Sequence, residues 1–380
     1  MMRAAVALIV TFILGAAVVS TAQSIPTDTI KDQTVGWMKI ITFPTPPMPA
    51  TVDTRTYSAA QLGIGRTLIG WMQSTYVPIG GLGDMVVAVS EKLGPYNQNT
   101  AALPQSYGAL ARIYTDLKYD AARKIVRASN SNIVWSVMAN GFYGEPADAL
   151  STPEQYYFTL PTFAQQAFGG EEAERAVDLS QHPVLGRYPS YFQRNSVNGN
   201  RKFVMLTKDN RLPYVAITKG DYLRVIEAAV ARLYATEKKK VDGDADPKSR
   251  EYFMKALDDK QARRLATLEN NKEKYKDRLS EPAKISTMQP DAMLENIPDV
   301  FEGSGGSAHS LQVYTIDPRS VAGAKTDMPQ WVVVSWTAHL TDPASKHLHE
   351  AVIGTFNFQY LHDYFFEPEK VQGQPYTPLK

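Results

Sequence analysis

The pattern of apolar and polar positions predicts a strand that runs directly into a long helix in the middle of the chain. Apolar runs at residues 203–206 and 212–217 flank the polar residues 208–211, which is typical of a β-hairpin. Thr218 then fits the N-cap of the following helix, because Asp221 can complete a near-capping box. The apolar stripe of this helix consists of Leu223, Ile226, Val230 and Leu233.

A second helical pattern follows, and it is rich in charged residues. It begins at Pro247 and continues to about Leu279, so the two helices are expected to form an αα-hairpin, which we call the arm (218–280). Because so many of its residues are charged, we expect much of the arm to be solvated. The same helices could also self-associate or bind a protein partner.

Alternating or continuous apolar runs predict strands on both sides of the arm. Neighbouring strands in a chain favour antiparallel pairing, so the predicted fold class is α+β: mainly antiparallel sheet, with the charged αα-hairpin inserted between the N- and C-terminal sheet-forming parts. A helix is predicted at 58–76, and the cleanest alternation of all is found at 351–360. The predicted strands are 37–43, 112–118, 133–139, 156–158, 311–316, 331–340 and 351–360.

These elements divide the chain into five parts. We predict a signal peptide at 1–22, an extended segment with a proline-rich connector at 23–57, an α+β region at 58–217, the helical arm at 218–280 and a C-terminal β-rich region at 281–380. The third and fifth parts are expected to form either one body or two, a choice that the pattern leaves open.

The first residues predict export. Arg3 precedes an apolar run at 4–19, and small residues at 20–22 end it, which is typical of a secretory signal peptide cleaved after about Ala22. A retained membrane anchor is the alternative, but the run is shorter than the roughly 20 residues that a spanning helix needs. We therefore expect an exported mature protein, periplasmic or secreted, that does not span a membrane.

Composition narrows the classes of function. The chain has no cysteine, so disulfides, thiolate metal ligands and cysteine nucleophiles are excluded. Removal of Arg3 with the signal peptide leaves as many basic as acidic residues, and this balance disfavours a nucleic-acid partner. With 44% hydrophobic residues, the chain can bury a core without covalent links.

Histidines near the C-terminus form the best candidate site. Four of the six lie there, and pairing of the last two predicted strands would bring His339 opposite Glu350. With His347 and His349 on one face of a strand, this set could hold a divalent metal and a water, the basis of metal-assisted hydrolysis. A solvated strand end is the simpler interpretation, because no His-Glu-x-x-His motif is present. The candidate ligands are His339, His347, His349 and Glu350.

Other motifs fail on spacing. The pairs Gly63-x-Gly65 and Gly81-x-Gly83 lack the third glycine of a dinucleotide fingerprint and the Lys-Ser/Thr of a P-loop, so we interpret them as turn and packing glycines. The aspartates within 242–246 resemble the start of a calcium loop, but the glycine and glutamate that such a loop needs are missing. We expect these aspartates to cap the following helix instead.

Aromatic clusters leave binding functions open. Groups at 156–158, 188–192 and 360–366 could form stacking platforms for sugar rings or for a protein partner, although core packing is the favoured interpretation. The favoured function is an exported binding or interaction protein of the cell envelope, for a small ligand, a glycan or a protein partner. No cofactor is expected apart from the divalent metal considered above, and the sequence favours binding over catalysis without deciding between them. A metal-assisted hydrolase that uses the C-terminal His/Glu cluster is the first alternative, and a structural envelope protein is the second.

Overall fold

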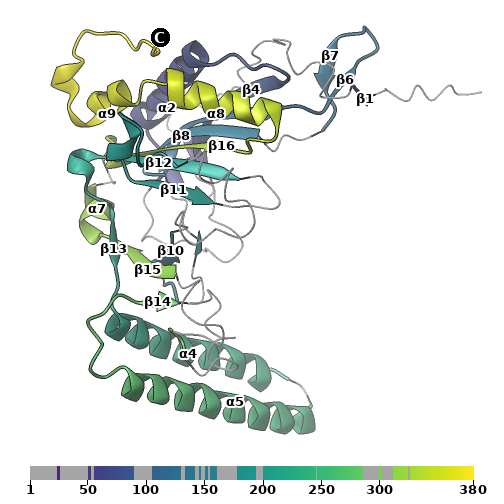
Figure 1. The fold of residues 1–380 in the computed structure, drawn as a ribbon. Helices are drawn as coiled ribbons and strands as arrows, with labels where there is room; N and C mark the ends of the chain where they lie inside the picture. The colour runs from purple at the N-terminus through teal and green to yellow at the C-terminus, as the bar shows by residue number, and fades with distance from the viewer. Residues whose placement is uncertain are drawn as a thin grey trace, which may run out of the picture.

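The computed structural model is an elongated molecule with a helix-covered antiparallel sheet at one end, a smaller sheet next to it and a pair of long helices at the other end (Figure 1). This arrangement confirms the α+β class. The predicted signal peptide, the strand expected at 37–43 and the proline-rich connector lie outside the described residues. The structure describes residues 24–25, 50–52, 55–89, 105–129, 133–141, 145–146, 150–152, 155–160, 178–193, 200–244, 246–285, 299–301, 311–323 and 326–380.

A six-stranded antiparallel sheet forms the larger body of the molecule (Figure 1). It consists of β4 (Leu82–Val89), β5 (Tyr107–Tyr114), β8 (Ile133–Ala139), β11 (Ser190–Gln193), β12 (Arg201–Thr207) and β16 (Trp331–Thr337). Their order is β11-β12-β16-β8-β5-β4, so β16, from the C-terminal part of the chain, lies between two strands from the N-terminal part. The two sheet-forming parts of the chain therefore share one sheet.

Three helices cover one face of this sheet (Figure 1). They are α2 (Ala59–Thr75), α8 (Pro343–Thr355) and α9 (Phe358–Phe366). The helix predicted at 58–76 is confirmed by α2, which begins where Ser58 and Gln61 form a reciprocal capping box. Its buried side, which includes Leu68 and Met72, packs with residues of the sheet and of α8 and α9 in one apolar cluster.

The opposite face of the large sheet carries a second apolar layer, which a smaller antiparallel sheet supplies. This sheet consists of β9 (Glu145–Pro146), β10 (Tyr157–Thr159), β13 (Tyr214–Ala216) and β15 (Leu311–Ile316), with β14 (Lys284–Ile285) paired to β15. Phe203 and Val333 of the large sheet pack with Phe158 of β10 and Tyr214 of β13. Because both faces of β16 are covered, all seven of its residues are buried, and all but Ser335 and Thr337 are apolar.

The predicted αα-hairpin is present, at the end of the molecule opposite to α8 and α9 (Figure 1). It consists of α4 (Lys219–Asp242) and α5 (Pro247–Lys274), which pack against each other. The capping box of Thr218 and Asp221 is confirmed, and Asp246 caps α5 as expected. Near the start of α5, Tyr252 and Phe253 are 71% and 49% exposed. Self-association or partner binding through this arm stays a prediction.

The strand predicted at 351–360 is wrong, because α8 and α9 occupy this stretch. The side chains of Asp342 and Asn357 cap the two helices by accepting hydrogen bonds from backbone N–H groups. Val352 and Phe356 fit the alternation of a strand, but they are also four residues apart, which is the spacing of one helical face, and both are fully buried. The caps, rather than the alternation, decide the structure here.

The hairpin predicted at 203–217 is also wrong. Both of its strands exist, but β12 pairs with β16 and β13 pairs with β15, in two different sheets. Between the strands, Asp209 and Asn210 have φ angles of 57° and 53°, in the left-handed region. The chain therefore leaves the large sheet at this turn and enters the smaller one.

Smaller elements complete the described chain. The strand predicted at 112–118 is divided between β5 and β6 (Leu117–Tyr119), which lie in different sheets. No helix in the part of the chain that the structure describes has both the length and the apolarity needed to cross a membrane. The other short elements are β1 (Ser24–Ile25), β2 (Ala50–Val52), β3 (Arg55–Tyr57), β7 (Ile125–Arg127), α7 (Pro318–Gly323) and the 3-10 turns η2 (Leu185–Arg187), η3 (Lys208–Asn210) and η5 (Pro368–Lys370).

A glycine lets α2 approach the large sheet closely. A Cβ atom added at Gly65 would lie 2.6 Å from the carbonyl oxygen of Gly108 on β5 and 2.7 Å from Cγ1 of Val87 on β4. At Gly63, two positions earlier in the same helix, the added atom would meet nothing within 4 Å. Gly65 is therefore a packing glycine, whereas Gly63 only lowers helix propensity.

Alanine substitutions at these two glycines are expected to change stability in opposite directions. Gly63→Ala should raise the free energy of unfolding by about 0.5–1 kcal/mol, because alanine is the better helix former. Gly65→Ala should lower it by about 1–3 kcal/mol, because the methyl group forces α2 away from β4 and β5. Urea unfolding of both variants checks the pair. Equal changes in the free energy of unfolding at the two positions would contradict the close approach of α2 to β4 and β5.

Candidate functional site

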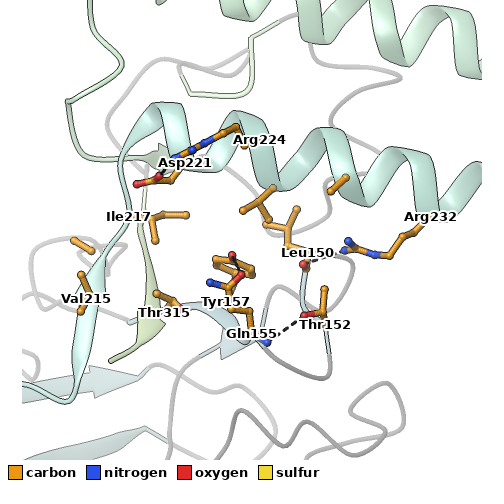
Figure 2. Close-up of a pocket in the computed structure, with 13 residues that line it drawn as sticks. Leu150, Thr152, Gln155, Tyr157, Val215, Ile217, Asp221, Arg224, Arg232 and Thr315 are labelled. Carbon is orange, nitrogen blue, oxygen red and sulfur yellow. Dashed lines mark hydrogen bonds and ion pairs between the residues drawn. The ribbon is translucent and has the colours of Figure 1, made fainter. Parts of the chain in front are cut away.

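A cavity of about 570 Å³ lies between α4 and the small sheet (Figure 2). Residues of β10, β13 and β15 form one wall, and α4 forms the other. The α4 wall consists of Asp221, Arg224, Val225, Ala228 and Arg232, which recur at intervals that place them on one side of the helix. Residues of α4 that face elsewhere, such as Ile226 and Val230, are buried in the apolar cluster shared with α5.

Much of the cavity wall is apolar and accessible. Val215 of β13 is 44% exposed, and it lines the cavity together with Ala216, Val225 and Ala228. The ring of Tyr157 lies in the wall that β10 forms (Figure 2). Exposed apolar side chains that gather in a concave surface favour contact with an apolar part of a ligand.

Two arginines give the α4 wall an excess of positive charge. Arg224 forms an ion pair with Asp221, whose pKa is lowered mainly by the hydrogen bond from the Thr218 hydroxyl. Arg232 is exposed and donates a hydrogen bond to the carbonyl oxygen of Leu150 over 3.1 Å (Figure 2). Among the described residues, no carboxylate forms an ion pair with Arg232. As far as the described residues go, its remaining N–H groups are available to an anion.

The polar groups of the cavity are suited to binding rather than to proton transfer. Asp221 is committed to the helix cap and to Arg224. Burial raises the pKa of Tyr157, and its hydroxyl donates to Oε1 of Gln155 over 2.8 Å. Neither group is therefore a general base near neutral pH.

The four metal ligands predicted from the sequence lie elsewhere, after β16 and on α8. His339 is exposed, and its Nε2 lies 3.2 Å from the Thr341 hydroxyl. His347 contacts the Tyr76 hydroxyl at 3.3 Å. The buried His349 accepts a hydrogen bond from Trp336 Nε1 over 2.9 Å, and the exposed Glu350 lies 3.8 Å from Lys346.

These four residues do not converge on one point. In the described part of the chain, the one group of three or more His, Asp or Glu side chains with ligand atoms close enough to share an ion is His362, Asp363 and Glu367. The predicted pairing of His339 with Glu350 required a strand at 351–360, and the helix α8 removes it. A metal bound by the four residues stays a prediction that the geometry does not support.

The cavity between α4 and the small sheet was not predicted from the sequence. The helical spacing of Asp221, Arg224, Val225 and Arg232 is readable in the sequence, and it could have identified a mixed charged and apolar face. The second wall has no such signal, because Tyr157, Val215 and Thr315 come from separate strands that only the fold brings together.

Comparisons with protein families, curated proteins and solved structures supply no function for this chain. It matches no family model, and no curated protein or solved structure is significantly similar to it. Any account of its function therefore rests on its own residues and their geometry.

His349 provides a test of the packing between α8 and the large sheet. Burial, with a smaller effect of Lys202, lowers the pKa of His349 from 6.5 to about 4. Between these values the unfolded chain binds more protons than the folded protein, so His349 makes stability rise with pH across this window and level off above it. Trp336 Nε1 stabilises the neutral form by donating to Nδ1.

His349→Gln is expected to flatten the pH dependence of stability between about pH 4 and 6.5, by up to about 3 kcal/mol across the window. The glutamine carbonyl can still accept the hydrogen bond from Trp336, so the variant should fold. Urea unfolding at several pH values measures the slope. The exposed His339→Gln is the control, and it should keep the slope of the unmodified protein. An unchanged slope in His349→Gln would show that this imidazole is not buried in its neutral form.

Proposed function

We propose that this is an exported binding protein that holds a small ligand in the cavity between α4 and the small sheet. The ligand would combine an apolar body with one anionic group. The observation that carries the proposal is the position of Arg232, a guanidinium without an acidic partner among the described residues, beside exposed apolar side chains. Export is supported by the signal-peptide pattern of the first 22 residues.

The size and lining of the cavity support a small ligand. Its volume of about 570 Å³ falls in the range of roughly 300–1,000 Å³ that is typical of small-molecule sites. Val215, Val225 and Ala228 would contact the apolar body. Arg232 would bind the anionic group through charge-assisted hydrogen bonds, for which a planar guanidinium is well suited.

Binding is favoured over catalysis because the cavity lacks a nucleophile with a neighbouring base in the described residues. Asp221 is tied to the cap of α4, and Tyr157 keeps its proton near neutral pH. The alternative function, a metal-assisted hydrolase, has less support. Its chemistry requires ligand side chains that meet at one point, and these residues do not meet: His339, His347, His349 and Glu350.

Comparison of decanoate with its neutral analogue decanamide separates the contribution of the anionic group from that of the apolar body. We expect decanoate to bind the purified protein about tenfold more tightly than decanamide, because only the carboxylate makes charge-assisted hydrogen bonds with Arg232. Arg232→Gln should abolish this difference while its amide can still donate to Leu150. Val215→Asn should weaken both ligands alike, because both need the apolar wall. Isothermal titration calorimetry measures each affinity.

Arg263→Gln is the matched control for charge. Arg263 is exposed on α5, outside the cavity, and its substitution changes the net charge of the arm by the same amount. It should leave both affinities unchanged. The proposal is wrong if neither compound binds, or if Arg232→Gln behaves as Arg263→Gln does.

A further inference from the structure

We propose that α9 carries a binding site for a divalent transition-metal ion, formed by His362, Asp363 and Glu367. Nδ1 of His362 lies 3.1 Å from Oδ1 of Asp363 and 3.9 Å from Oε2 of Glu367. All three ligand atoms lie within 4.8 Å of one another. The site is independent of the cavity beside α4, because it lies on a different helix at the other end of the molecule (Figure 1).

The distances suit an ion of this class after a small adjustment. Zinc and related ions bind nitrogen and oxygen ligands at about 2.0–2.2 Å, so neighbouring ligand atoms around them lie about 2.8–3.6 Å apart, from octahedral to tetrahedral geometry. The pair His362–Asp363 already has such a separation, at 3.1 Å. Glu367 is partly exposed at the end of the helix, and a small rotation of its side chain would bring its carboxylate to the same point.

Groups around the three residues hold them in position. Gln359 donates from Nε2 to Oδ1 of Asp363 over 2.6 Å, and Arg187 in turn donates to the amide oxygen of Gln359. The rings of Tyr188 and Phe366 lie 5.8 and 5.4 Å from the imidazole of His362. Hydrogen-bonded ligating carboxylates and a surrounding apolar shell are the features that orient and tune ligands in metal sites.

The charges also favour a cation at this place. The side chain of Asp363 is only 9% exposed, so its carboxylate is largely removed from solvent. Lys370 Nζ lies 2.5 Å from Oε2 of Glu367 and is the one cation in ion-pair contact with either carboxylate in the described residues. The ammonium group thus pairs with one of the two carboxylates, and a divalent ion would balance both.

One imidazole and two carboxylates define the class of metal. Imidazole favours zinc, iron, nickel or copper, carboxylates favour manganese or magnesium, and a mixed set suits Zn²⁺ or Mn²⁺. Three protein ligands leave coordination positions for water. Lys370 competes with the ion for Glu367, so the ammonium group must be displaced when the metal binds.

This competition allows a test in which loss of a ligand and loss of Lys370 change the metal affinity in opposite directions. Purified protein without an affinity tag is treated with a chelator and titrated with ZnCl₂, and then with MnCl₂, by calorimetry. We expect one ion per chain. His362→Gln and Glu367→Gln should each weaken binding by at least about tenfold, because each removes a ligand. Lys370→Gln should strengthen binding by about threefold or more, because the competing cation is gone.

His339→Gln is the matched control, since it removes an exposed imidazole from the site that the sequence predicted. It should leave the affinity unchanged. Circular dichroism establishes that the variants are folded, and Asp363 is left intact because it is buried. The proposal is overturned if no ion binds, if His362→Gln binds like the unmodified protein, or if Lys370→Gln does not bind more tightly. Loss of binding in His339→Gln alone would assign the metal to the other histidines.

Discussion

Burial of β16 on both of its faces is the constraint on which the rest of the structure depends. Val332, Val334 and Trp336 pack toward α2, α8 and α9, whereas Trp331 and Val333 pack toward the small sheet. Removal of apolar surface from water stabilises by roughly 25 cal/mol per Å², so a strand that is covered on both sides contributes more than a half-exposed one. By pairing with β12 and β8, this strand also joins segments that are far apart in the chain.

The walls of the cavity beside α4 are the outer sides of β13 and α4. The inner sides of these two elements are packed against the rest of the protein. Tyr214 of β13 is buried in the layer beneath the large sheet, and the next residue, Val215, points to the other side and lines the cavity. On α4, Ile226 is buried in the core of the arm, while its neighbour Val225 lines the cavity. The packed sides hold both walls in place, which is what a preformed binding site requires.

Helix caps in the sequence predicted the structure better than the alternation of apolar and polar residues did. The caps at Thr218 and Asp246 predicted the starts of α4 and α5 correctly, because a cap depends on residues within one turn. The alternation at 351–360 failed because its apolar residues satisfy the strand and the helix period at once. The predicted pairing of His339 with Glu350 depended on that strand. The mistaken strand also hid the candidate metal site on α9, because His362 and Glu367 come close together only when the chain between them is helical.

The sequence by itself determined the α+β class, the charged arm with its caps, and the exclusion of cysteine chemistry, because these depend on residue identity and on neighbours a few positions away. Only the tertiary structure decided that β12 pairs with β16 instead of β13, and that Val215 and Arg232 line one cavity. The physical reason is that strand pairing and side-chain environment result from competition among contacts between distant segments. The free energy of each such contact depends on which other segments are already in place.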